Sequence, residues 1–216
     1  MAVRKIIFWE VDAQADFMLP GGKLYVPGAE KIIPNVRSLV NAAAEAGVFL
    51  ISSGDAHTEN DPEFRRFPPH CLRGTPGAQI IPEGLAGNFL VIPNDASQKL
   101  PEDALRRPQV VLEKQTLDVF DNPHASELVE RLGSGAEYIV FGVVTEYCVE
   151  RAAKGLIDRG RKVSIVKDAI ETLKPEDGRR ALDDLQALGA RLVTTDEALA
   201  MAGARQGVDN LRRTVN

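Results

Sequence analysis

The chain has 216 residues; 44% are hydrophobic and 26% are charged, and 26 Lys and Arg against 31 Asp and Glu give a formal net charge of −5. The length suggests one large domain, and the apolar fraction is enough to build a core, which excludes wholesale disorder. An acidic chain without a basic run is not typical of a nucleic-acid-binding protein. The apolar stretches, such as residues 139–144, fall far short of the ~20 residues that span a membrane. The first residues show no signal-peptide cleavage site, so we expect a cytoplasmic protein without nucleic-acid or membrane partners.

The inventory of reactive side chains is short: two cysteines, Cys71 and Cys148, and three histidines. Two cysteines cannot form a disulfide framework, and their number excludes a zinc site built mainly of thiolates. Any metal or thiol chemistry in this chain must therefore draw on most of this small set.

Hydrophobic patterning predicts the first part of the chain as strand, helix, strand and a long loop. Residues 3–11 form a β-branched apolar run typical of a buried strand. Pro34 suits the first turn of a helix whose apolar positions recur every three or four residues and which ends at Gly47. Residues 48–53 are the second predicted strand. Residues 54–83 are polar and rich in Pro and Gly, and so long a loop in a compact domain usually carries function.

The rest of the chain alternates between strand and helix patterns. The further predicted strands are residues 89–92 (a short extra strand), 110–113, 138–143, 163–166 and 191–194. The further predicted helices are residues 125–132, 146–159 and 176–188, with a short one from Asp196. This alternation predicts a single α/β domain, a doubly wound parallel sheet of six main strands with helices on both faces. We assign residues 1–201 to this domain and residues 202–216, which carry little core signal, to a C-terminal tail.

Reactive side chains follow the predicted strands, where the site of a doubly wound sheet lies. Asp12 follows the first main strand, Asp55 and His57 follow the second, Lys114 ends the third, and Cys148 follows the fourth. In the common strand order 3-2-1-4-5-6, Lys114 starts two strands from Asp12, roughly 10 Å across the sheet. Only the long lysine side chain, or curvature of the sheet, closes that distance.

Cys148 stands in the first turn of a predicted helix, with Thr145 as its expected N-cap. A thiol at a helix N-terminus feels the positive end of the helix dipole, which lowers its pKa. The same position also suits a small buried hydrophobic residue, which is the common fate of a free cysteine. The position of Cys148 alone supports these two interpretations equally.

The long polar loop carries a candidate metal site. Its expected ligands are Asp55, His57, Glu63 and His70. Mixed histidine and carboxylate ligands with open positions suit Zn²⁺, Fe²⁺ or Mn²⁺. Asp61 and Glu59 are near enough in the chain to compete with Glu63. On spacing alone, a surface loop with solvated histidines is the commoner outcome.

Three segments match motifs that occur together in one family. One is the run Val11-Asp12-x-Gln14-x-Asp16-Phe17, and another is residues 141–149, with the sequence FGVVTEYCV. Lys114 lies between them. Together they resemble the isochorismatase-like cysteine hydrolases, and within these the nicotinamidases, over residues 6 to about 200. The resemblance implies that Asp12 is the catalytic acid and base, Lys114 the catalytic lysine and Cys148 the nucleophile.

The same resemblance implies the surroundings of the nucleophile. It places an oxyanion hole at the backbone N–H groups of Val144 and Cys148, beside a cis peptide bond between Val143 and Val144. It makes Asp55, His57, His70 and, as the variable fourth ligand, Glu63 the holders of one divalent metal ion. The implied contacts to the substrate ring are Phe17, Phe67 and Phe120. A homo-oligomer, dimer or larger, is also implied.

The implied reaction is hydrolysis of nicotinamide to nicotinate and ammonia through a thioester on Cys148. True isochorismatases typically lack this cysteine, so its presence argues against that activity. Three alternatives remain. One is a related cysteine hydrolase acting on another small amide or ureido compound, and another is a non-catalytic metal-binding member of the fold. A flavodoxin-like nucleotide-binding module is the third, and the lack of a glycine-rich loop after the first strand counts against it.

Overall fold

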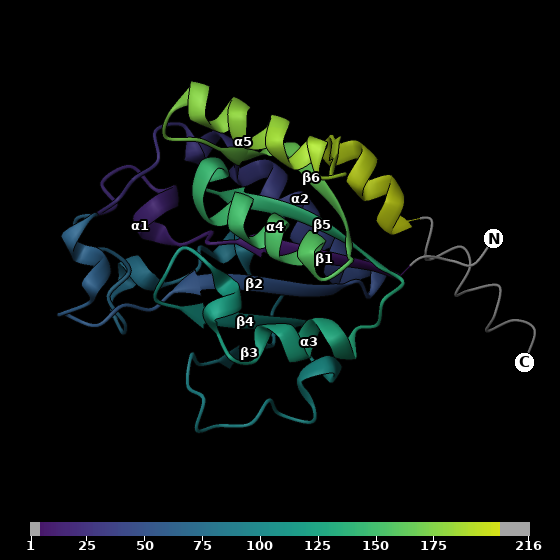
Figure 1. Cartoon of the computed structure of the whole chain (residues 1–216), viewed down its shortest axis with the longest axis horizontal. Helices are drawn as coiled ribbons and strands as arrows, with labels where there is room; N and C mark the ends of the chain where they lie inside the picture. The colour runs from purple at the N-terminus through teal and green to yellow at the C-terminus, as the bar shows by residue number, and fades with distance from the viewer. Residues whose placement is uncertain (1–4, 204–216) are drawn as a thin grey trace, which may run out of the picture.

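The computed structural model describes residues 5–203, and one parallel seven-stranded sheet runs through the middle of this part of the chain (Figure 1). Its strands are β1 (Lys5–Val11), β2 (Phe49–Asp55), β3 (Phe89–Ile92), β4 (Gln109–Lys114), β5 (Ala136–Val143), β6 (Lys162–Glu171) and β7 (Arg191–Val193). The strand order is β3-β4-β2-β1-β5-β6-β7. When the short edge strand β3 is left out and the six main strands are numbered along the chain, this order is the expected 3-2-1-4-5-6. The predicted doubly wound fold is confirmed.

Helices cover both faces of the sheet (Figure 1). The helices are α1 (Ala15–Met18), α2 (Ala29–Ala46), α3 (Ala125–Arg131), α4 (Glu150–Asp158) and α5 (Pro175–Ala187), and residues 195–203 are also helical. α3, α4 and α5 contribute to one core, whereas α1, α2 and residues 195–203 contribute to the other. Successive residues of β1 serve the two cores in turn, because side chains alternate along a strand. Trp9 packs against Tyr138 in one core, and Phe8 packs against Phe141 in the other.

α2 begins five residues earlier than its sequence pattern predicts. Pro34 lies inside the helix, where it removes one backbone hydrogen bond, and not in the first turn. Ala29 and Ile32 are both buried, and they extend the apolar stripe of the helix toward its N-terminus. Pro34 itself faces solvent. Burial of the extended stripe therefore outweighs the local preference of the proline.

The carboxyl ends of the central strands lie close together because β1 and β5 approach tightly. Gly142 pairs with Val11 in the sheet and adopts φ +117°. A Cβ atom at this position would lie 2.0 Å from the carbonyl oxygen of Val11. Only glycine fits there without a shift of the backbone, and this close approach places the turn after β5 beside Asp12.

The long polar segment after β2 folds as short 3₁₀ turns over the sheet edge: η1 (Pro62–Arg65), η2 (Pro76–Ala78) and η3 (Pro82–Gly84). Asp16 holds it in place, because its carboxylate accepts a hydrogen bond from the backbone N–H of Cys71 at 2.7 Å; the same carboxylate also accepts the N–H of Lys23, in the loop after α1, at 3.0 Å. Cys71 is fully buried in the core. This segment is therefore ordered by contacts with the rest of the domain.

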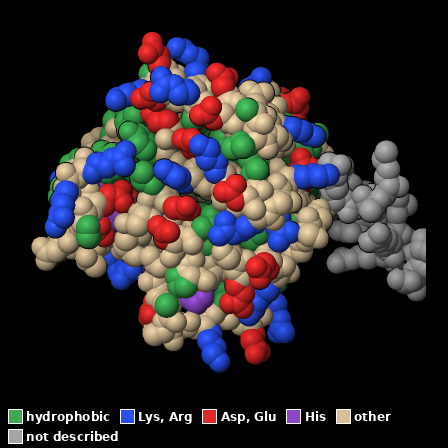
Figure 2. Space-filling model, in the orientation of Figure 1, with side chains coloured by type: hydrophobic (Ala, Val, Ile, Leu, Met, Phe, Trp, Pro, Cys, Tyr) green, Lys and Arg blue, Asp and Glu red, His purple; other side chains and the backbone are tan. Residues whose placement is uncertain are grey.

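Side chains of both charge signs are interspersed over the face seen in Figure 2. Within residues 5–203, no helix is both long and apolar enough to cross a membrane. The expected C-terminal tail begins within the last helix, and residues 204–216 lie outside the described residues, as do residues 3–4 of the expected first strand.

Candidate active site and metal centre

Lys114 lies among three other buried polar groups at the carboxyl edge of the sheet. Its Nζ is 2.9 Å from Oδ2 of Asp12 and 3.4 Å from Sγ of Cys148, and it also donates a hydrogen bond to Oδ1 of Asp55. The lysine side chain starts on β4 and reaches past β2 to the residue that follows β1. Its length closes the gap of two strands, and the ammonium group contacts both carboxylates and the thiol.

The backbone and side chain of Asp12 are both anchored to Ser53. Ser53 Oγ donates to Oδ1 of Asp12 at 2.7 Å, and the backbone N–H of Asp12 donates to the Ser53 carbonyl oxygen at 3.2 Å. Asp12 adopts φ +48°, which is uncommon for a residue with a side chain. Burial raises the pKa of Asp12 above its ordinary value and Asp55 adds to the rise, while Lys114 opposes it. A carboxyl group in this state is suited to accept a proton and return it.

Cys148 lies in a π-helical turn, η6 (Thr145–Val149), that joins β5 to α4. The expected N-cap is wrong: the hydroxyl of Thr145 donates to the carbonyl oxygen of Glu171 at 2.8 Å. The expected lowering of the thiol pKa is wrong too. Burial raises the pKa of Cys148 well above its ordinary value, against the opposing effect of Lys114, and the hydrogen bond with Asp12 adds to the rise. This environment favours the protonated thiol, and the carboxylate of Asp12 lies beside it. The peptide bond between Val143 and Val144 is cis.

Three of the expected metal ligands form one buried cluster. The ligand atoms of Asp55, His57 and His70 all lie within 4.8 Å of one another. Nε2 of His57 is 3.6 Å and Nε2 of His70 is 3.4 Å from the same oxygen, Oδ2 of Asp55. The opposite ring nitrogens have other neighbours: Nδ1 of His57 is 3.0 Å from Asp61 Oδ2, and Nδ1 of His70 is 2.8 Å from the Pro68 carbonyl oxygen. Such contacts orient metal-binding histidines in proteins.

The donor set fits a divalent transition-metal ion. Two imidazoles and a carboxylate are typical ligands of Zn²⁺ and Fe²⁺. Within residues 5–203, both ring nitrogens of His57 are buried without a hydrogen-bond partner, and Nε2 is the one that faces Asp55, where a metal ion could bind. Glu63 is half-buried and lines the same pocket as Asp55 and His70, but it is not part of the three-residue cluster. Its competitor Glu59 is exposed.

A narrow, mostly apolar pocket opens onto the thiol. Its lining includes Asp12, Cys148, Phe17, Phe67, Leu24, Leu117, Tyr147, Val144 and Leu173. The cavity volume is about 20 Å³, room for about one water molecule. The ring of Phe17 lies 5.3 Å from that of His70, and the ring of Phe67 stands perpendicular to that of Tyr147 at 5.8 Å.

The structure does not bring Phe120 to this pocket. Its ring lies 5.7 Å from Trp9, and the guanidinium group of Arg159 is 3.8 Å from its centroid. It packs closely under α4, where a Cβ at Gly155 would come within 2.2 Å of its ring. Leu117, three residues earlier, is the pocket residue from this segment.

A family model described as the isochorismatase domain matches residues 7–97 and 87–197. The chain belongs to the isochorismatase family. It is 26% identical over 212 residues to the nicotinamidase of Escherichia coli (strain K12), covering 85% of this chain and 92% of that protein. A zinc complex of the pyrazinamidase from Pyrococcus horikoshii superposes with a TM-score of 0.70 at 31% identity, covering 88% of this chain and 99% of that one. N-carbamoylsarcosine amidase from Thermoplasma acidophilum has the same fold, with a TM-score of 0.69, 21% identity, and coverage of 89% and 97%.

Sequence reasoning missed several residues of this isochorismatase-family site. Asp61 was weighed only as a ligand, yet it contacts His57 and also caps η1, where its carboxylate accepts the N–H of Glu63 at 2.9 Å. Ser53, which anchors Asp12, had a detectable signal as a polar residue inside an apolar strand. Leu173 had none, because only the folded chain brings it to the pocket, whereas Tyr147 directly precedes Cys148 in the matched motif.

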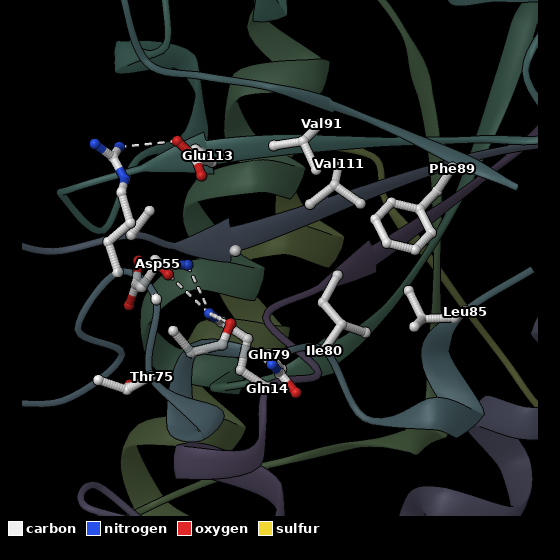
Figure 3. Close-up of a pocket in the computed structure, with 15 residues that line it drawn as sticks. Gln14, Asp55, Thr75, Gln79, Ile80, Leu85, Phe89, Val91, Val111 and Glu113 are labelled. Atoms are coloured by element: carbon white, nitrogen blue, oxygen red, sulfur yellow. Dashed lines mark hydrogen bonds and ion pairs between the residues drawn. The ribbon is translucent and has the colours of Figure 1, made fainter. Parts of the chain in front are cut away.

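Gln14 and Asp55 both line a second cavity, of about 410 Å³ (Figure 3). Its amide accepts the N–H of Asp55 and donates to the carbonyl oxygen of the same residue, at 2.7 Å in both cases. Val91, Val111 and Phe89 form an apolar wall of this cavity, at a distance from the Arg73–Glu113 ion pair (Figure 3). Gln14 thus fixes the backbone of Asp55, a member of the buried three-residue cluster.

Proposed function

We propose that this protein is a metal-containing cysteine amidohydrolase that converts nicotinamide to nicotinate and ammonia. The observation that carries the proposal is the contact of Lys114 with Asp12 and Cys148, directly beside the Asp55, His57 and His70 cluster. An apolar pocket between aromatic side chains favours a flat ring as substrate. The nicotinamidase and pyrazinamidase relatives support an aromatic carboxamide.

In the first half of the reaction, Asp12 takes the proton of the Cys148 thiol, and the sulfur forms a bond to the carboxamide carbon. The backbone N–H groups of Val144 and Cys148 are proposed to bind the developing oxyanion. Asp12 then returns its proton to the amide nitrogen, the C–N bond breaks, and ammonia leaves. Lys114 stabilises the negative charge while it moves between carboxylate and sulfur.

In the second half, the acyl group is attached to Cys148 as a thioester. Asp12 takes a proton from a water molecule, whose oxygen attacks the thioester carbon. The C–S bond breaks, the acid is released, and the sulfur recovers its proton. One water is consumed, and the net products are a carboxylic acid and ammonia.

Asp55, His57 and His70, with Glu63 in the same pocket, are the residues that would hold one divalent cation. The bound ion would supply a Lewis acid that accepts the lone pair of a pyridine nitrogen. Phe17 and Phe67 are proposed to contact the faces of the ring. Glu63 as fourth ligand and a homo-oligomeric state remain predictions.

The test measures ammonia release from nicotinamide and, separately, from N-carbamoylsarcosine, with protein loaded with Zn²⁺, Mn²⁺ or Fe²⁺. We expect turnover of nicotinamide and a loss of at least ~10³-fold in Cys148→Ala, because the nucleophile is removed. Cys71→Ala is the matched control and retains activity, since Cys71 lies in the core. Substantial activity in Cys148→Ala would contradict the thioester mechanism.

The same experiment distinguishes the alternatives. A higher rate with N-carbamoylsarcosine would indicate a ureido substrate in place of nicotinamide, with the same cysteine mechanism. If neither compound is turned over by metal-loaded protein, and iodoacetamide does not modify Cys148 faster than Cys71, the proposed function fails and the non-catalytic alternative is favoured.

A further inference from the structure

Glu146 holds a neighbouring segment of the chain with both of its carboxylate oxygens. Oε1 accepts the backbone N–H groups of Leu173 at 3.0 Å and Lys174 at 2.9 Å. Oε2 accepts the hydroxyl of Thr172 at 2.6 Å. Thr145, the adjacent residue, donates to the carbonyl oxygen of Glu171. Residues 171–174, which we call the β6–α5 segment, are thus fastened to the turn that carries the nucleophile.

This segment forms one wall of the pocket. The side chain of Leu173 lines the cavity together with Cys148 and Tyr147. On its other side the segment rests on α5, where a Cβ at Gly178 would lie 2.5 Å from Oγ1 of Thr172. The wall can therefore yield little toward α5, and Glu146 fixes it along the pocket.

Hydrogen bonds to a charged acceptor are about twice as strong as neutral ones, and here one carboxylate accepts three of them. Without Glu146, two backbone N–H groups lose the acceptor that orders them, and the Thr172 hydroxyl keeps only the Lys174 carbonyl oxygen, at 3.0 Å. The cavity has a volume of only about 20 Å³, and Leu173 is part of its lining. A change in the Leu173 wall therefore changes which molecules reach the sulfur.

We propose that Glu146 is a positioning residue that sets the width of the substrate pocket through Leu173 and restricts the enzyme to amides of a single small ring. The proposal rests on the proposed amidohydrolase function for its substrate readout. It does not require Glu146 to touch the substrate or to exchange a proton with it.

The first test compares kcat/KM for nicotinamide with kcat/KM for quinoline-3-carboxamide, which carries a second fused ring. In Glu146→Ala we expect kcat/KM for nicotinamide to fall about tenfold or more, since small misplacements are costly in an oriented site. The ratio of quinoline-3-carboxamide to nicotinamide should rise at least tenfold. Glu146→Gln keeps one oxygen for the two N–H groups and should retain most of the wild-type ratio.

Two further variants separate positioning from a general effect. Leu173→Ala should raise the same ratio by itself, and Glu146→Ala should add little to it in the double variant, because both act on one wall. Glu150→Gln is the matched control: Glu150 lies one helical turn away, pairs with Lys154 on α4, and should leave the ratio unchanged. Full additivity of Glu146→Ala and Leu173→Ala would overturn the proposal.

A second readout needs no substrate. The rate of Cys148 modification by N-phenylmaleimide, divided by the rate with iodoacetamide, should rise at least fivefold in Glu146→Ala and Leu173→Ala. A shift in this ratio in a protein that hydrolyses neither amide would sustain the pocket-width inference while the proposed function fails. An unchanged ratio in folded Glu146→Ala, checked by thermal melting, would overturn the inference whatever the activity.

Discussion

Cys148 is 6% exposed and stands 3.4 Å from the ammonium group of Lys114, and still burial raises the pKa of its thiol. The positive end of a helix is worth about 1 kcal/mol or less at most sites. Removing a thiolate from water costs more than that. In the proposed reaction, this burial gives Asp12 the task of taking the proton of the thiol as the sulfur attacks.

Glu10 is a further buried acid, and its burial predicts an effect of pH on stability. It is fully buried on β1, where Ser52 donates a hydrogen bond to Oε2 at 2.6 Å. Gln109 donates to the same serine, and its side-chain oxygen accepts the N–H of Ala86, so the network ties the segment after η3 to the sheet. Burial raises the pKa of Glu10 from 4.5 to about 8, and Asp12 adds to the rise.

Because the pKa of Glu10 is higher in the folded chain, the folded state binds the proton more tightly than the unfolded state. The free energy of unfolding should therefore fall as the pH rises from about 4.5 to about 8. The loss is at most about 5 kcal/mol, since one pKa unit is worth about 1.4 kcal/mol. Urea unfolding at pH 5.5, 7 and 9 measures it.

Glu10→Gln should remove most of this pH dependence, because the amide cannot ionise. Glu130→Gln, at an exposed position of α3, should leave it as in the wild type. Identical pH slopes in wild type and Glu10→Gln would contradict the assignment.

At the scale of elements, sequence patterns predict the strands and their order, but they miss helix ends and irregular turns. The six main strands follow from apolar runs, and their order follows from the common doubly wound topology. The start of α2 was missed because burial of Ala29 outweighs the signal of Pro34. The π-helical form of η6 has no periodic signature, although such turns often occur at functional sites. The contacts of Asp61 and Glu146 depend on the conformations of loops, which hydrophobic periodicity does not predict.

The pairing of β1 with β5 depends on Gly142. In Gly142→Ala, the new Cβ would lie 2.0 Å from the Val11 carbonyl oxygen, in a backbone conformation that alanine rarely adopts. We expect a loss of about 3 kcal/mol or more in the free energy of unfolding, or no soluble protein. Urea denaturation measures it. Gly135→Ala is the control, because a Cβ there meets no atom within 4 Å; equal stability of the two variants would disprove the packing argument.

For the whole molecule, the proposed metal links ligand binding to stability. A ligand that binds only the folded state stabilises it by about 2.7 kcal/mol at one hundred times its Kd. For a chain of this size, each kcal/mol shifts Tm by roughly 2–4 °C. Adding Zn²⁺ to chelator-treated protein should therefore raise Tm by roughly 5–10 °C.

Two histidine variants make this prediction specific. His70→Asn should lose the metal-dependent rise in Tm, because His70 belongs to the buried cluster. His124→Asn should keep it, because His124 lies elsewhere and its Nε2 contacts the Asp95 carbonyl oxygen. A rise of equal size in both variants would place the metal at another site.

The position of β1 also has a consequence for how the chain folds during synthesis. β1 is made first, yet one of its two partners, β5, is encoded more than a hundred residues later. At a ribosomal rate of ~5–20 residues per second, an apolar strand waits roughly ten seconds for that partner. Pairings so distant in sequence give a high contact order and slow folding. The pairing that places Asp12 beside the turn after β5 therefore leaves the apolar strand β1 without one of its two partners until β5 emerges.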